Sequence, residues 1–297
     1  MGTLINRLLY ALTFVLVMFS LANRLLDEST GERRPPPPGI EAPEPGEALR
    51  GPYARRRPLI EPAPLAPPDR WDPAIVVEAD QPPHDSVGSA FAVTAGVWLT
   101  ARHVVDGCAR VGIVQPEGFI RAVGRILNHP EADLALLRTA RSGPALKLGD
   151  SSDLKAGIEG FAVGYPSGAP GEATGVLIGR GRKREKGRFR RFDAVEPVLI
   201  WAEKNRRPAR LDSLGGLSGG PMLAADGRVL GVMEASSLRR GRMVTSQPGS
   251  AELLFRRSGT TPVRRAARLR LHPSGLTRTA DRLREQRSVV LVVCDAR

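Results

Sequence analysis

The sequence has few of the residues that staple a small protein or bind a metal. Its 297 residues include only two cysteines, and aromatic residues make up 5% of the chain. Two cysteines are too few for a disulfide framework, and they lack the spacing of a metal site, so we expect neither a metal nor a cofactor. With so few aromatic residues, a core must rest on valine, leucine, isoleucine and alanine. At 41% hydrophobic residues, the chain still has material for one sizeable core with appendages.

Sustained helical periodicity is also missing from the middle of the chain. Twelve runs of strand length recur there instead, separated by glycine, proline and aspartate. Six of them precede a connector around residues 148–157 and six follow it, and a short helical stretch at 250–257 ends the series. This pattern predicts an all-β fold of two antiparallel six-stranded β-barrels with a cleft between them.

The N-terminal part differs from the rest in composition. Residues 8–22 form a largely apolar run of 15 residues, which is short for a bilayer span of about 20 residues. We therefore expect a signal peptide or an uncleaved signal anchor over residues 1–26, with a buried helix as the alternative. Residues 27–70 are rich in proline and predict a disordered linker. Either form of the first segment implies export.

Positive charge is concentrated in two places. The formal net charge is +13, of which residues 180–191 carry +7 and the segment from Arg256 to the C-terminus carries +8. The rest of the chain, including most of the two barrels, is therefore close to neutral. The stretch 180–191 predicts a solvated arginine-rich hairpin tip or a contact for anionic surfaces such as phospholipid head groups. We expect no specific nucleic acid partner for an exported chain.

Three short motifs carry candidate chemistry. The stretch GLSGGP (216–221) places Ser218 between glycines, where a sharp turn can present its hydroxyl and aim backbone N–H groups at one point. A serine hydroxyl needs an adjacent base, and that base needs an orienting carboxylate. His103 ends the motif TARH (100–103), and Asp133 lies in ADLALL (132–137).

The order of these motifs and their flanking residues resembles the trypsin-like (chymotrypsin-fold) serine proteases, most closely the bacterial HtrA/Deg-type branch. The resemblance covers roughly residues 74–255. It implies that His103 is the base, Asp133 the orienting acid and Ser218 the nucleophile, with an oxyanion hole formed by the N–H groups of Gly216 and Ser218. Residues 71–257 would then be the protease domain, and residues 258–297 a basic C-terminal extension too short for a PDZ module.

The resemblance says less about specificity. Asp212 lies six residues before Ser218, an offset at which trypsin has the acid of its specificity pocket. Glu234 lies in GVMEAS, a strand that lines the substrate cleft in relatives and usually has serine or threonine at that point. We therefore expect Asp212, Glu234, Ala235 and Ser236 to contact substrate, and a carboxylate at 234 would favour basic substrates or perturb His103. The preferred substrate stays open.

These observations predict a serine endopeptidase that acts on proteins or peptides. The alternatives are a catalytically inactive protease fold that binds peptides, and an adaptor that works through its basic loops. We expect the protein in the periplasm, or anchored in the inner membrane by its N-terminal segment and facing the periplasm.

The two cysteines can form an intramolecular bridge only with each other. Cys108 follows His103 by five residues, and Cys294 ends the apolar run 288–293. An exported chain meets an oxidising compartment, so a Cys108–Cys294 disulfide is predicted, with two free thiols as the alternative. An apolar strand at 288–293 is a liability when exposed, and we expect it to pair with a barrel edge.

Overall fold

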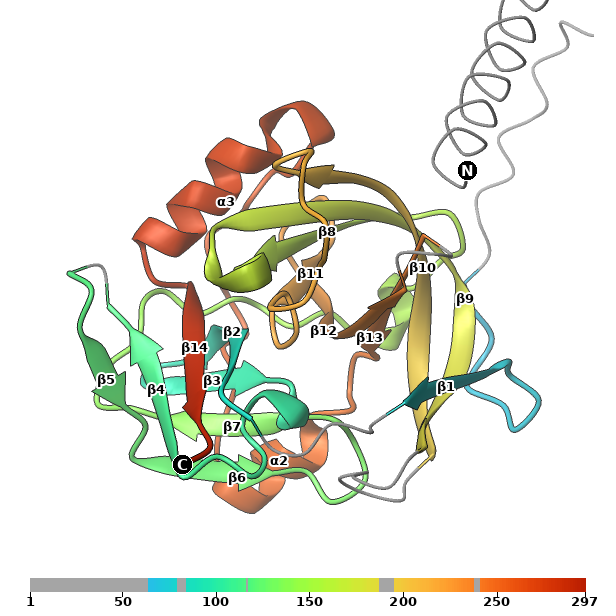
Figure 1. The fold of residues 1–297 in the computed structure, drawn as a ribbon. Coiled ribbons are helices and arrows are strands. Elements are labelled where there is room, and N and C mark those ends of the chain that lie inside the picture. The colour runs from blue at the N-terminus through green and yellow to red at the C-terminus, as the bar shows by residue number, and fades with distance from the viewer. Residues whose placement is uncertain (1–63, 79–83, 116, 187–194, 238–240) are drawn as a thin grey trace, which may run out of the picture. The chain divides into compact units, whose positions relative to one another are not determined.

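Strands dominate the part of the chain that this computed structural model describes, which comprises residues 64–78, 84–115, 117–186, 195–237 and 241–297 (Figure 1). These residues belong to one unit, Glu61–Arg297. The predicted N-terminal segment 1–26 and most of the predicted linker lie outside the described residues. Within the described ranges, no helix is long and apolar enough to cross a membrane.

The second half of the chain closes into a six-stranded barrel. Its strands are β8 (Glu159–Gly164), β9 (Gly171–Lys186), β10 (Val195–Arg207), β11 (Pro221–Leu223), β12 (Val229–Ser237) and β13 (Arg242–Ser246). They pair in the order β9-β10-β13-β12-β11-β8, and β8 pairs again with β9 to complete the ring. The strand β1 (Ala74–Glu78) adds to β9 in parallel. Sequence order suggested the first barrel for this strand, whereas it extends the second.

The first half forms a curved sheet of seven strands that does not close. Its members are β2 (Ser86–Thr94), β3 (Val97–Thr100), β4 (Arg110–Val114), β5 (Ile120–Ala122), β6 (Arg125–Asn128), β7 (Ala135–Arg138) and the C-terminal β14 (Val289–Asp295). The order is β5-β4-β14-β2-β3-β7-β6. The all-β double-barrel architecture predicted from the sequence is confirmed, but one half is an open sheet of seven strands.

The C-terminal strand β14 lies inside this sheet. It pairs on one side with β2 and on the other with β4, so the predicted pairing with the barrel is confirmed, but β14 is a central strand and not an addition at an edge (Figure 1). Val290 and Val292 of this strand belong to the hydrophobic core that residues of β2 and β4 also line. The segment predicted as a C-terminal extension thus supplies part of the first sheet.

Two helices precede this strand. The helix α2 (Glu252–Ser258) ends at Gly259 in a left-handed conformation, as glycine allows. The helix α3 (Leu276–Glu285) buries Leu276, Ala280 and Leu283, a spacing that places all three on one face. The same helix contacts β8, β9 and β14, so it bridges the two halves of the fold.

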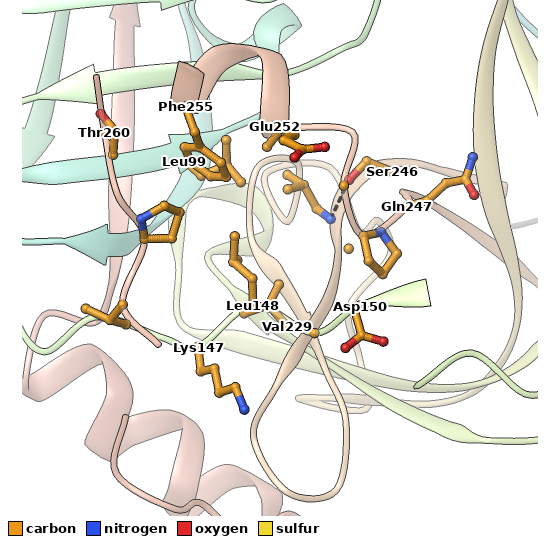
Figure 2. Close-up of a pocket in the computed structure, with 18 of the residues that line it drawn as sticks. Leu99, Lys147, Leu148, Asp150, Val229, Ser246, Gln247, Glu252, Phe255 and Thr260 are labelled. Carbon is orange, nitrogen blue, oxygen red and sulfur yellow. Dashed lines mark hydrogen bonds between the residues drawn. The ribbon is translucent and has the colours of Figure 1, made fainter. Parts of the chain in front are cut away.

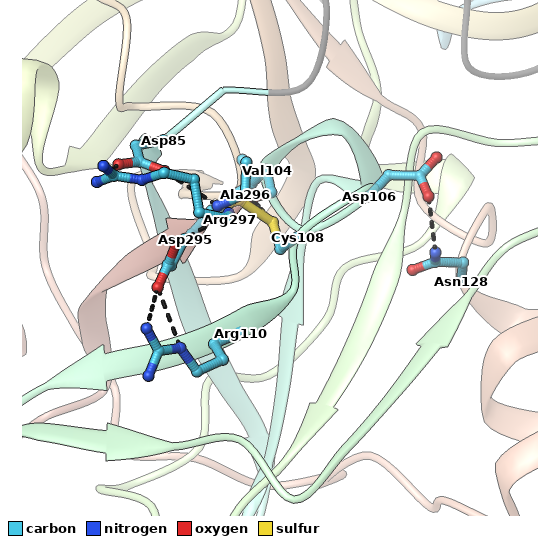
Figure 3. Close-up of a disulfide and its surroundings, with 10 residues drawn as sticks. Asp85, Val104, Asp106, Cys108, Arg110, Asn128, Asp295, Ala296 and Arg297 are labelled. Carbon is cyan, nitrogen blue, oxygen red and sulfur yellow. Dashed lines mark hydrogen bonds and ion pairs between the residues drawn. A yellow bond between two sulfur atoms is a disulfide. The ribbon is translucent and has the colours of Figure 1, made fainter.

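A disulfide fastens the end of β14 to the turn that follows His103. Cys108 and Cys294 are bonded, with their Cα atoms 5.5 Å apart (Figure 3). Arg110 pairs with Asp295 at 2.5 Å between Nη2 and Oδ2, next to the bridge. The bridge joins residues 186 positions apart, so the C-terminal strand is held covalently as well as by its pairing.

Candidate active site

His103 and Asp133 meet through side chain and backbone. His103 lies in the short 3-10 turn η2 (Arg102–Val104) after β3, and Asp133 lies just before β7. The two strands β3 and β7 are paired, which brings both residues to the same end of the sheet. Asp133 Oδ2 lies 2.7 Å from His103 Nδ1, and Asp133 Oδ1 accepts the His103 backbone N–H at 2.9 Å. The carboxylate therefore fixes both the ring and the turn that carries it.

The Ser218 loop packs against the same end of the first sheet. Ser218 O accepts the N–H of Ser89 in β2 at 2.8 Å. A Cβ at Gly219, which has φ +84°, would lie 2.0 Å from Ser89 O and 3.0 Å from the N of Ala101, two residues before His103. Only glycine permits so close an approach, so the GLSGGP sequence allows Ser218 to lie beside the His103 turn.

Ser89 is a contributor to this loop that sequence reasoning missed. Its fully buried hydroxyl donates to Gly216 O at 2.7 Å and accepts the N–H of Tyr165 at 2.9 Å. Gly216 itself has φ +94°, and a Cβ there would lie 2.4 Å from Tyr165 O. Ser89 thus holds the loop in a conformation that requires glycine. A serine in an alternating strand offers no sequence signal for such a role.

The two N–H groups predicted to form an oxyanion hole are those of Gly216 and Ser218. Within the described part of the chain, neither Gly216 nor Ser218 donates a backbone hydrogen bond to another residue. Neighbouring N–H groups are bonded, since Leu217 donates to Leu214 O and Gly219 donates to Met233 O. Two unused donors in one turn can serve an anion, which is the requirement for oxyanion stabilisation.

A buried lysine lies behind Asp133. Lys183 Nζ donates to Asp133 Oδ2 at 2.9 Å, the same oxygen that contacts His103 Nδ1. It also lies 2.6 Å from Glu234 Oε2 and 3.3 Å from Glu196 Oε2. Glu196 in turn accepts the backbone N–H of Asp133 at 2.9 Å. Because the lysine and the three acids are all buried, their ion pairs are shielded from water.

This arrangement shifts the pKa values of the groups in opposite directions. Burial alone would raise the pKa of Asp133, but the charges of His103 and Lys183 and their hydrogen bonds hold it well below its usual range. Burial and the nearby Glu196 raise the pKa of Glu234 well above its ordinary value. Burial also raises the pKa of Glu196. Burial would lower the pKa of Lys183, but the three carboxylates raise it well above normal.

The placement of Lys183 corrects the prediction of a solvated hairpin tip at residues 180–191. Arg180 and Lys183 are 8% and 3% exposed and belong to β9. Arg180 donates to Ala66 O at 2.6 Å and to the side chain of Gln247. Arg184 is exposed, and residues 187–191 lie outside the described residues. A contact of this stretch with anionic surfaces stays a prediction.

The residues predicted to contact substrate fall into three groups. The Glu234 carboxylate, expected in the substrate cleft, lies in the interior against Lys183. Asp212 is exposed in the loop before Ser218. The strand β12 includes Ala235 and Ser236. A substrate contact of Asp212, Ala235 or Ser236 stays a prediction.

A pocket of 910 Å³ lies apart from these residues. It is bounded by α2 and the start of β12, with Leu99, Leu148, Val229 and Phe255 in its wall (Figure 2). His103, Asp133 and Ser218 are absent from its lining. A smaller pocket of 520 Å³ is bordered by Gly216, one of the two residues predicted to form the oxyanion hole.

Comparisons with known proteins agree with the family suggested by the motifs. Residues 88–232 match the model of the trypsin-like peptidase domain. A probable periplasmic serine endoprotease DegP-like of Marinomonas sp. is 30% identical over 159 residues, which are 52% of this chain and 31% of that protein. The putative serine protease HhoA of Synechocystis sp. is 33% identical over 154 residues, 50% of this chain and 36% of that protein.

The HtrA-type protease AlgW with decapeptide has a TM-score of 0.45 and 24% identity, and the similarity covers 58% of this chain and 50% of that one.

The matched region contains the whole candidate site. The chain spans about a third of the length of the curated relatives it matches. The matched residues 88–232 run from β2 into β12 and contain all three candidate catalytic residues. On the matched family model, the double-barrel topology and these relatives, the chain contains a trypsin-like peptidase domain related to the HtrA/Deg proteases.

Proposed function

We propose that this protein is a serine endopeptidase in which His103, Asp133 and Ser218 act as a triad. The observation that carries the proposal is the double contact of Asp133 with His103, at 2.7 and 2.9 Å, beside a loop whose glycines let Ser218 approach the same turn. Such an arrangement orients an imidazole as a base toward a hydroxyl.

The chemistry follows from these positions. His103 takes the Ser218 hydroxyl proton as Oγ forms a bond to the amide carbon, and the N–H groups of Gly216 and Ser218 stabilise the oxyanion. The protonated His103 then gives that proton to the amide nitrogen as the C–N bond breaks. Water, deprotonated by His103, attacks the acyl ester, and His103 then gives this proton to Ser218 Oγ as the ester C–O bond breaks. Asp133 stabilises the charged imidazole throughout.

The relatives support a substrate class and a location. Several of them are described as periplasmic serine endoproteases, which supports protein or peptide substrates and an exported chain. The N-terminal apolar run supports export and leaves membrane anchoring as part of the proposal.

A fluorophosphonate probe tests the proposal. The wild-type protein should be labelled, and Ser218→Ala should lose labelling completely. Ser213→Ala is a matched control, because Ser213 lies in the same loop and its hydroxyl accepts the Gly215 N–H. Labelling that persists in Ser218→Ala would mean that another residue is the nucleophile. A wild type that is never labelled would favour an inactive peptide-binding scaffold.

A further inference from the structure

Lys183 is the only lysine or arginine that contacts three buried carboxyl groups in the described part of the chain. The groups that face it come from three places: Asp133 before β7, Glu196 in β10 and Glu234 in β12. His103 in η2 contacts the same oxygen of Asp133 as Lys183 does. One lysine therefore connects the second barrel to the residue that orients the candidate base.

The pairing of the strands explains how this lysine meets the acids. Lys183 in β9 lies directly opposite Glu196 in β10, so the two side chains share one face as a cross-strand pair of opposite charge. In β12 the pairing with β13 shifts between Met233 and Ala235, which leaves Glu234 as a bulged residue. A bulge can redirect a side chain, and here the Glu234 carboxylate meets Lys183.

We propose that Lys183 is a positioning residue that fixes the orientation and the charge of Asp133, an inference that rests on the proposed proteolytic function. Asp133 Oδ2 is shared by Lys183 Nζ and His103 Nδ1, while Oδ1 accepts the His103 N–H. These three donors hold the Asp133 carboxylate in one orientation, and the carboxylate in turn orients the His103 ring.

The lysine charge also counters the acids around the base. A charged imidazole is favoured by every nearby carboxylate and disfavoured by a nearby cation. Lys183 Nζ donates to the same Asp133 oxygen that contacts His103 Nδ1, so its positive charge opposes that of the acids beside the candidate base.

A purely structural lysine would behave differently. Lys183 joins elements of both halves of the fold, so its removal lowers stability in either case. A structural role, however, gives no reason for the pH dependence of the folded protein to change. The acidic limb of the activity profile, which is the pH range in which activity is lost as pH falls, therefore separates the two roles.

The experiment compares Lys183→Met with Arg180→Met. Arg180 is three residues away in the same strand, is buried, and bonds to Ala66 and Gln247 rather than to the acids. For Lys183→Met we expect the acidic limb of the fluorophosphonate labelling rate to move up by about one pH unit. The plateau rate should fall about tenfold, because Asp133 loses a donor. Arg180→Met should keep the wild-type limb.

Two further measurements keep the outcome decisive. Because Lys183→Met leaves three acids without a cation, Lys183→Met with Glu234→Gln provides a variant with fewer buried carboxyl groups, and the acidic limb of its labelling rate should also be displaced. In a Ser218→Ala background, the NMR titration of the His103 ring needs no activity and should show the same upward move when Lys183 is replaced.

The results separate this inference from the proposed function. The inference would be overturned if the folded Lys183 variants kept both the wild-type titration of the His103 ring and the wild-type acidic limb of the labelling rate. A wild type that is never labelled, combined with a displaced His103 titration, would refute only the proteolytic function.

Discussion

The strand β9 contributes to a buried ion pair near its start and to a buried cluster of charged groups near its end, and the two sites differ in their ratio of acids to bases. At its start, Glu172 meets Arg284 of α3 at 2.9 Å. Arg284 also donates to Gly171 O at 2.6 Å and bonds to Asp281 at 2.8 Å. Farther along β9, Lys183 alone faces three carboxyl groups. There, Glu196 Oε1 and Glu234 Oε1 have no hydrogen-bond partner among the described residues.

This difference indicates different roles. A buried charge whose donors are satisfied fastens two elements together, and Arg284 fastens α3 to the second barrel. A cluster with excess acid and unsatisfied oxygens is costly to keep, and such groups occur where chemistry needs a shifted pKa. The Lys183 cluster lies behind the candidate base, and the Arg284 pair lies under a helix.

Of the substitutions at these two sites, we expect Asp133→Asn to have the largest effect, and the effect is on turnover. The amide cannot supply the negative charge that the imidazolium needs, so turnover of a peptide substrate should fall by about 10⁴-fold, the loss expected when a triad acid is replaced by its amide. Circular dichroism should show a folded protein. Near-wild-type turnover in a folded variant would mean that another acid orients His103.

Arg284→Met tests the other ion pair of β9. Loss of the cation leaves Glu172 buried without its charged partner, and the free energy of unfolding should fall by about 3 kcal/mol in urea denaturation. The acidic limb of the activity profile should stay in place, because Arg284 does not contact the acids around His103. Adding Glu172→Gln should recover part of the stability, since it removes the unpaired charge. A displaced acidic limb would mean that the two ends of β9 are not separate in function.

The contrast between the two ends also shows how far the sequence could lead. Alternating apolar runs place most strands, and the three motifs place His103, Asp133 and Ser218 on the loops they occupy. The sequence could not place β14 between β2 and β4, because a central position depends on pairing between strands that are far apart in the chain. A central strand and an edge strand can have the same apolar pattern.

Lys183 was hidden for a different reason. It stands among arginines in a run that is typical of a solvated loop, and nothing within that run marks one position as buried. The informative signal lies elsewhere, in the glutamates at 196 and 234, each of which has apolar residues on both sides in its strand. A carboxylate in such a strand needs a buried cation or a proton, and the two together indicate a basic residue on a neighbouring strand.

We expect the smallest effect from Glu234→Gln, which changes how the stability of the protein depends on pH. The folded-state pKa of Glu234 is raised by burial and by Glu196, so the folded protein holds this proton more tightly than the unfolded chain does. Its favourable contribution is complete below the unfolded pKa, at about pH 4, and is lost as pH rises toward the folded pKa. Glutamine is the neutral isostere, can still accept from Lys183, and does not titrate.

The melting temperature of Glu234→Gln relative to wild type should therefore increase between about pH 5 and pH 8. Asp133 affects stability with the opposite sign, because its lowered pKa gives stability that is lost only as pH falls below about 4. Both proteins contain Asp133, so its contribution cancels in the difference between about pH 5 and pH 8. Thermal unfolding at several pH values, with Glu172→Gln as the control from the other end of β9, measures the difference. If Glu234 is ionised in the folded protein at pH 5, the variant loses an ion pair at every pH and its melting temperature falls by the same amount throughout.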